Sequence, residues 1–186
     1  DRNRIAKYSF GEDFRIFCLS FLKDYSYLAA NFFGSIRYFK IGELENNNSN
    51  EHPPIHEETA VLKFLASDIK NIAYSSDGRF LAVSAVNIDK HSKLLIFILD
   101  ASSLLILGHF DCGALSSSEN ITNLMCFALK SQEADWADYI LITAVEEGVL
   151  KKFEFSIRGS KIPESNLKIS VITPFDKVIE ITAICL

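Results

Sequence analysis

Three stretches of the chain can be laid over one another, and this internal repeat limits the possible folds more than any other feature. In each stretch an apolar run ends in a polar turn, a second run enters small residues, and a third run carries an aromatic residue near its end. The second runs begin at Leu28, Leu81 and Leu141, which are 53 and 60 residues apart. The clearest turn is Asp77-Gly78, within YSSDGRFLAVSA at 74–85. A repeat of this length indicates one supersecondary unit copied along the chain.

Short runs rich in β-branched and aromatic residues, separated by turn signals, predict that the unit is made of strands. One more short run precedes each later copy, at Val61 and Leu104, which gives four strands a unit. The stretch 133–155 also contains good helix formers and is compatible with an amphipathic helix. Its β-branched residues and Gly148 favour strands instead. The sequence therefore predicts an all-β fold.

A four-stranded unit recurring at this period is typical of a β-propeller blade. One such sheet cannot bury both of its faces, whereas blades stacked around an axis cover one another. Propellers have four to eight blades, so three blades are expected to form an incomplete ring. Either the chain is an excerpt of a larger propeller, which we favour, or other chains complete the ring. The expected segments are the end of a preceding blade at 1–13, a blade at 14–66 with a long polar loop at 42–58, a second blade at 67–110, a third blade at 111–175, and the first strand of a following blade at 176–186.

The chain resembles the WD40-repeat family in several of these segments. YSSDG at 74–78 is similar to that family's FSPDG, and LAVSA at 81–85 is similar to its LASGS. FGSIRYFK at 33–40 and EGVLKKFE at 147–154 are similar to its DGTVKIWD. The resemblance implies a WD40-like β-propeller segment of four-stranded antiparallel blades.

In that family a hydrogen-bonded His–Asp–Trp network stiffens the blades, and this chain departs from the family at the positions of that network. The Gly108-His109 pair lies too far before Ile121 to be the family's Gly-His pair. The family's Trp-Asp pairs are replaced by Phe39-Lys40, Phe97-Ile98 and Phe153-Glu154. We therefore expect a divergent WD40-like segment without that network.

Charge and composition argue against several classes of partner. The chain has 19 Lys and Arg against 24 Asp and Glu, a net charge of −5. Nucleic-acid binding usually requires a basic stripe, and none is visible, so no nucleic-acid partner is expected. No apolar stretch approaches the roughly 18–20 residues of a membrane span. The four cysteines form no Cys-x-x-Cys pair, which favours a reducing, cytoplasmic location: Cys18, Cys112, Cys126 and Cys185.

No residue pattern points to catalysis, to a cofactor or to a metal. His52 and His56 have a spacing that suits a metal site on a helix, but Pro53 and Pro54 between them forbid that helix. The chain contains no nucleophile elbow, phosphate-binding loop or dinucleotide-binding turn. We therefore expect no catalytic, cofactor-binding or metal-binding residue, no cofactor and no small-molecule substrate.

The resemblance suggests instead a rim of loops that contacts other proteins. In such blades the loop from the second to the third strand shares a rim with the loop into the next blade. Here these are Asn87–Ser92, and Cys112–Asn120 together with Ala66–Asp68. The residues expected to contact partners are Asn87, Asp89, Lys90, His91, Ser116, Ser117 and Glu119. Trp136, in a predicted turn at 130–138, is either a further interface anchor or a cap on the edge of a blade.

Two functions from different classes are compatible with such a segment. The first is a non-catalytic scaffold for protein–protein interaction in an intracellular multi-subunit complex, with a ciliary axoneme as the preferred setting. The alternative is a hydrolase whose active site lies in the central channel. That alternative requires polar side chains on the innermost strands, and the candidates IFCLSF, IKNIAYS and ITNLMCF offer few.

Overall fold

The computed structural model describes residues 19–21, 27–32, 35–40, 58–63, 67–87, 93–114, 125–146, 149–159, 161–163 and 167–172. Every regular element in these ranges is a strand, and no helix there is suited to crossing a membrane. The strands are β1 (Leu19–Phe21), β2 (Tyr27–Phe32), β3 (Ser35–Lys40), β4 (Glu58–Lys63), β5 (Ser67–Tyr74), β6 (Phe80–Asn87), β7 (Lys93–Asp100), β8 (Ile106–Ala114), β9 (Met125–Gln132), β10 (Trp136–Glu146), β11 (Val149–Arg158) and β12 (Lys168–Ile172). The strands β10 and β11 confirm the choice of strand over helix for the stretch 133–155.

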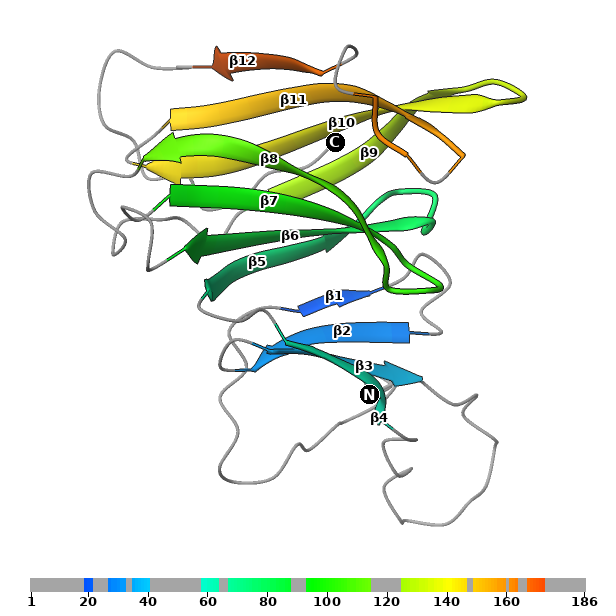
Figure 1. Cartoon of the computed structure of the whole chain (residues 1–186), viewed down its shortest axis with the longest axis vertical. Helices are drawn as coiled ribbons and strands as arrows, with labels where there is room; N and C mark the ends of the chain where they lie inside the picture. Colours follow the sequence, from blue (N-terminus) through cyan, green and yellow to red (C-terminus); the bar gives the residue numbers. More distant parts are fainter. Residues whose placement is uncertain are drawn as a thin grey trace, which may run out of the picture.

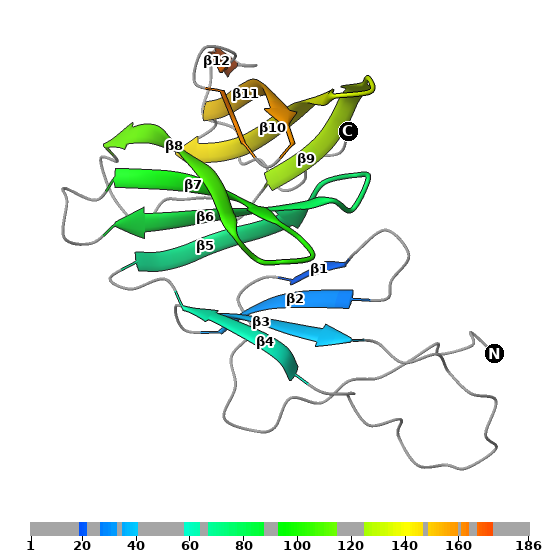
Figure 2. The same ribbon diagram turned by 45° about the vertical axis from the view of Figure 1, so that its right-hand side comes forward.

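These strands form three antiparallel sheets of four strands each, with the strand order following the chain order within each sheet (Figure 1). The first strands of the sheets lie side by side. The Tyr74 amide of β5 donates to Ser20 Oγ of β1 at 2.9 Å, and Ser75 forms a parallel bridge to Phe127 of β9. The sheets are stacked one after another, and they do not close a ring (Figure 2). The described residues therefore form a segment of a β-propeller with four-stranded antiparallel blades, as predicted.

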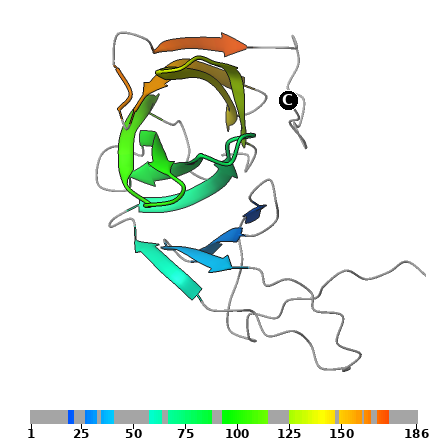
Figure 3. The same cartoon turned by 90° about the vertical axis from the view of Figure 1, so that its right-hand side faces the viewer.

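The apolar core lies between the sheets. One cluster of buried side chains joins the second sheet to the third, and another joins the first to the second. Every residue of β6 from Phe80 to Val86 is buried, because the second sheet is covered on both faces. Figure 3 shows the second and third sheets curving around a shared interior, with the first sheet beside the second. This arrangement matches the physical reason for the repeat, which is that each sheet needs a neighbour to bury its apolar faces.

The turn between β5 and β6 shows how one repeat is built and joined to the next. Gly78 has a φ of 76°, a conformation that glycine adopts without a steric penalty. Its amide donates to the Ser75 carbonyl at 2.8 Å, and the Ser75 amide donates to the Phe80 carbonyl at 2.9 Å. The Asp77 carboxylate accepts from Ser75 Oγ at 2.6 Å and from the hydroxyl of Tyr139, in the third sheet, at 2.8 Å. The turn therefore also links two sheets.

Two of the predicted loops were placed wrongly at their ends. The loop expected at Cys112–Asn120 is wrong at its start, because β8 continues to Ala114, and the rest of it lies outside the described residues. Cys112 is buried in the core between the sheets, and the Lys93 ammonium pairs with the Asp111 carboxylate at 2.8 Å, so this part of the chain stays in the sheet. Likewise, Glu58 belongs to β4 rather than to the polar loop 42–58. The rest of that loop lies outside the described residues.

Burial of Cys112 leads to a prediction about thiol chemistry. Burial raises the pKa of the Cys112 thiol from 9.0 to about 12, which lowers its reactive thiolate fraction about a thousandfold. We expect iodoacetamide at pH 8 to leave Cys112 unmodified in the native protein while modifying the partly exposed Cys126. Mass spectrometry of the digested protein measures both sites, and modification in urea is the positive control. Equal rates at the two cysteines in the native protein would contradict the burial of Cys112.

Candidate functional site

The third sheet has one buried face and one open face, because side chains alternate along its strands. In β10, Ala137, Tyr139 and Leu141 are buried against the second sheet, whereas Asp138 and Ile140 between them are partly exposed. The same alternation continues in β11. We call the exposed side of this sheet the open face; its residues are Lys130, Trp136, Asp138, Ile140, Ile142, Lys152, Glu154, Ser156 and Arg158.

The open face differs in chemistry from the faces that the sheets use to stack. When Phe153 of β11 is matched to Phe97 of β7, as the repeat requires, Lys152 and Glu154 occupy the positions of Ile96 and Ile98. Ile96 and Ile98 are fully buried between the second and third sheets. The third repeat therefore places charged residues where the second places its apolar core.

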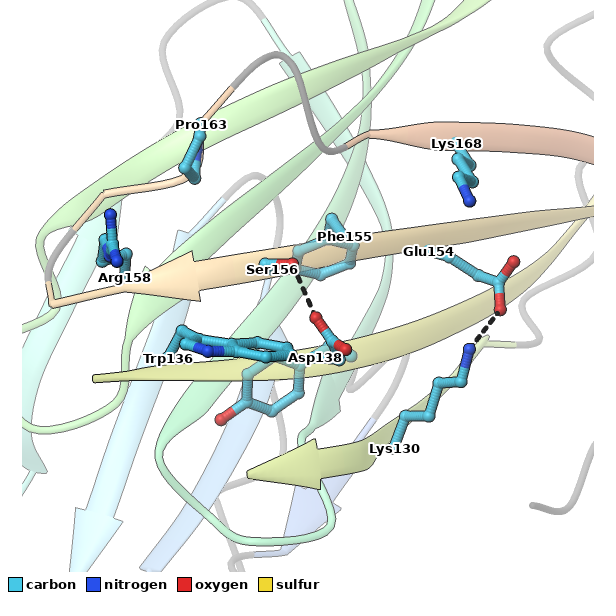
Figure 4. A pocket seen from close by; sticks show the side chains of 10 residues that line it. Lys130, Trp136, Asp138, Glu154, Phe155, Ser156, Arg158, Pro163 and Lys168 are labelled. Carbon is cyan, nitrogen blue, oxygen red and sulfur yellow. Dashed lines mark hydrogen bonds and ion pairs between the residues drawn. The ribbon is translucent and has the colours of Figure 1, made fainter. Parts of the chain in front are cut away.

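A cavity of about 600 Å³ lies at the charged end of the open face (Figure 4). It forms where β12 stops accompanying β11: the last pair between these strands is Glu154 with Lys168, and β11 continues to Arg158. The connector from β11 to β12 contributes Pro163 to the wall. The lining residues are Lys130, Trp136, Asp138, Tyr139, Glu154, Phe155, Ser156, Arg158, Pro163 and Lys168.

The connector is itself anchored to the neighbouring sheet. Ile162 packs against the core shared by the second and third sheets and lies over Gly108 of β8. A Cβ at Gly108 would lie 3.4 Å from Ile162 Cδ1, so the connector passes within van der Waals contact of β8. The packing of Ile162 holds the connector against β8 and so supports Pro163 at the edge of the cavity.

The two carboxylates of the cavity are already engaged by neighbouring donors. Ser156 Oγ donates to Asp138 Oδ1 at 2.6 Å, and Ser131 Oγ donates to Asp138 Oδ2 at 3.1 Å. Glu154 Oε1 lies 3.2 Å from the ammonium groups of both Lys130 and Lys152. Hydrogen bonds from Lys152 and then Lys130 lower the pKa of the Glu154 carboxyl, so that it is ionised at neutral pH.

The remaining cations of the cavity are less constrained. Within the described part of the chain, neither the Arg158 guanidinium nor the Lys168 ammonium takes part in an ion pair or a side-chain hydrogen bond. Both residues are exposed. The same part of the chain contains no group of three His, Cys, Asp or Glu residues that could hold a metal ion. The arrangement suits binding of a ligand by charge and shape.

The structure places few of the residues predicted to contact partners. Asn87 is the last residue of β6, paired with Ser67 on one side and Lys93 on the other, rather than a loop residue. Ser67 and Asp68, also assigned to a loop, belong to β5. These residues remain in the sheet because their backbones pair with β6. The other predicted residues, namely Asp89, Lys90, His91, Ser116, Ser117 and Glu119, lie outside the described residues.

The predicted turn around Trp136 was wrong. Trp136 is the first residue of β10 and pairs with Arg158 of β11, and the turn is reduced to 133–135. The polar residues of this segment stay in the sheet because they face outward, where Asp138 accepts its two hydroxyl hydrogen bonds. Trp136 also lies at the opposite end of the strands from Asn87, since β9 runs parallel to β5 and Asn87 pairs with the start of β5. The structure therefore does not bring these two predicted sites together.

Sequence analysis missed the charged cavity. One signal was available, because the run LKKFEFSIR at 150–158 alternates polar and apolar residues where KLLIFILD at 93–100 is nearly all apolar. Comparing the repeats position by position would have marked Lys152 and Glu154 as outward-facing residues. The part played by Arg158 and Lys168 depends on where β12 leaves β11, which the sequence pattern does not indicate.

Comparisons with known proteins support the fold. No model of a protein family and no curated protein matches the chain. Among solved structures, the WD40 domain of SCAP from fission yeast is similar over 87% of this chain and 31% of that one, with 14% identity and a TM-score of 0.57. KlHsv2, with its loop 6CD replaced by a Gly-Ser linker, is similar over 87% of this chain and 45% of that one, with 11% identity and a TM-score of 0.44. The chain thus spans less than half of each of these structures.

Proposed function

We propose that this chain is a non-catalytic scaffold for protein–protein interaction, forming part of a larger WD40-like propeller in an intracellular multi-subunit assembly. The observation that supports this most directly is that both faces of the second sheet are buried against its neighbours. Apolar packing holds the sheets as a rigid stack. The connecting turns and the charged end of the open face are then surfaces available to partners.

The chemistry of the described residues favours binding over catalysis. The two carboxylates of the cavity are held by serine hydroxyls or by lysines, and the lining residues include no histidine or cysteine. The innermost strand of the second sheet, β5, presents mainly apolar side chains to its neighbours. These observations give the hydrolase alternative no specific support.

We further propose that the assembly lies in the cytoplasm, with a ciliary axoneme as the preferred setting. The four cysteines lack the close pairing of a disulfide framework, which supports a reducing compartment. Localisation of the tagged protein in ciliated cells tests this setting, and exclusion from cilia would contradict it.

The scaffold role is tested by native fractionation of the tagged protein from its own cells. We expect it to elute at a mass well above its own, together with a fixed set of proteins. Replacing Lys90 and His91 by serine should weaken that association about tenfold, or about 1.4 kcal/mol, if the predicted loop contacts partners. The matched control is Arg79→Ser, which removes an exposed cation from the turn between β5 and β6 and should leave the association unchanged. Elution of the natural protein as a free monomer would contradict the scaffold role.

A further inference from the structure

The cavity on the open face carries an excess of positive charge, although the whole chain has a net charge of −5. Its lining includes the cations Lys130, Arg158 and Lys168, with Lys152 beside them, against the anions Asp138 and Glu154. Glu154 is shared by two lysines, so it neutralises only one of them. The cavity is therefore a local basic site on an acidic chain.

The positions of the cations fit a ligand with more than one negative charge. Figure 4 shows Arg158 near Trp136 and Pro163 at one end of the cavity, and Lys168 on the Glu154 side at the other. A single small anion would meet one of these groups, whereas an extended chain with carboxylates along it can meet both. Arg158 presents a planar fork that matches a carboxylate, and Lys168 acts as a point charge.

The apolar part of the lining favours a peptide over a simple polyanion. The Trp136 ring and Pro163 supply apolar surface next to Arg158. Tryptophan and arginine are both enriched among the residues that supply most of the binding energy at protein interfaces. The two carboxylate oxygens of Asp138 already accept hydrogen bonds from Ser156 and Ser131, so Asp138 does not offer a free carboxylate to a cationic ligand.

A second apolar sheet is a poor occupant for this end of the face. Covering it in the way the third sheet covers the second would remove Lys130, Lys152, Arg158 and Lys168 from water with only two carboxylates to compensate. Burying a charge is costly unless it is paired. The occupant must therefore bring negative charge of its own.

We propose that the cavity between Trp136, Arg158, Pro163 and Lys168 binds an extended acidic peptide segment of a partner protein. Its carboxylates would meet Arg158 and Lys168, and an apolar side chain would lie against Trp136. The inference rests on the proposed scaffold role for its biological meaning, but it concerns a different surface from the predicted loops. Binding of a purified peptide tests it without reference to the cellular assembly.

The sole tryptophan of the chain lines the cavity, so intrinsic fluorescence reports occupancy directly. The probe is a synthetic peptide of about twelve residues alternating Glu and Leu, titrated into the chain at low salt. We expect a change in Trp136 emission with a dissociation constant on the order of 1–100 µM, weakened by added salt. A fluorescein-labelled copy of the peptide gives the same constant by anisotropy, and Trp136→Phe removes the emission change.

Two variants decide whether the site is the one proposed. Arg158→Gln combined with Lys168→Gln should weaken binding at least about tenfold, because both carboxylate contacts are lost. Lys161→Gln is the matched control, since Lys161 is exposed on the same connector but does not line the cavity, and it should change binding less than about twofold. All three positions are exposed, so folding should be unaffected, and thermal unfolding checks this.

Four results would overturn the proposal. Absence of binding is one, and equal weakening by Lys161→Gln and by the double variant is another, because attraction would then be non-specific. The third is equal binding of a peptide in which Gln replaces Glu. Shielding of Trp136 from acrylamide in the protein without peptide would show that another part of the chain covers the face, and it too counts against the proposal. A loss of peptide binding with the native complex intact would refute this site but not the scaffold role.

Discussion

Replacing Phe153 by Ala is expected to lower the free energy of unfolding by about 3–5 kcal/mol. Phe153 is fully buried between the second and third sheets, where its ring stacks on Phe110 of β8 with the centroids 5.6 Å apart. Phe110 also contacts Phe155 at 4.9 Å, so the substitution leaves a cavity inside a packed aromatic cluster. Urea unfolding followed by circular dichroism measures the loss.

The matched control for this substitution is Ile169→Ala. Ile169 of β12 pairs directly with Phe153 in the same sheet, but 49% of it is exposed to solvent. Truncating it removes apolar surface from a site that is already hydrated, so the expected loss is below about 1 kcal/mol. Equal losses at the two positions would mean that the second and third sheets do not pack against each other as described.

Sequence patterns were sufficient to predict the architecture, because the repeat and the burial of its apolar residues have the same cause. The small and branched residues of 80–86 are buried from both sides, and a run of that kind needs a sheet on each face. The Asp77-Gly78 step specified a tight turn, and the positive φ of Gly78 shows why glycine is required there. Local chemistry and tertiary packing agree at these positions, which is why the strands and their antiparallel order could be predicted.

The candidate site could not be predicted in the same way, because it depends on strand register. A register shift between Asp138 and Tyr139 of β10, against β9, sets which side chains of this hairpin face outward. A slip of one residue exchanges the two faces of a strand, and no rule from composition fixes the position of such an irregularity. The polar run 130–138 was therefore predicted to be a turn, although most of it belongs to the strands β9 and β10.

The link between Asp77 and Tyr139 is expected to contribute about 1.5–3 kcal/mol to stability, the range for a hydrogen bond to a charged group. The Tyr139 hydroxyl donates to Asp77 Oδ2 at 2.8 Å across the boundary between two sheets. Tyr139→Phe removes this bond and keeps the buried ring, which packs edge-on against Phe80. Asp77→Ala should cost more, because it also removes the acceptor of the Ser75 hydroxyl within the turn.

A double-mutant cycle separates these two contributions. If the Tyr139 hydroxyl stabilises the protein through Asp77, then Tyr139→Phe should change the free energy of unfolding little in a protein that already carries Asp77→Ala. In that protein the hydroxyl has lost its acceptor, so the only effect left is the removal of an unpaired hydroxyl. Urea unfolding of the four proteins gives the coupling free energy. A value near zero would show that this hydrogen bond does not stabilise the junction between the two sheets.

The same pair makes stability depend on alkaline pH. Burial and then the hydrogen bond to Asp77 raise the pKa of the Tyr139 phenol above its ordinary value of 10.0. Tyr139 therefore stays protonated in the folded protein at a pH where it ionises in the unfolded chain, so its contribution is complete below pH 10 and is lost as the pH rises beyond that value. We expect the stability difference between the natural protein and Tyr139→Phe to be constant from pH 7 to 9 and to shrink steadily above pH 10.

The other five tyrosines are common to both proteins, so their ionisation largely cancels in the comparison. A difference that stays constant through pH 11 would mean that the phenol titrates alike in the folded and unfolded states, and hence that it is not buried against the Asp77 carboxylate.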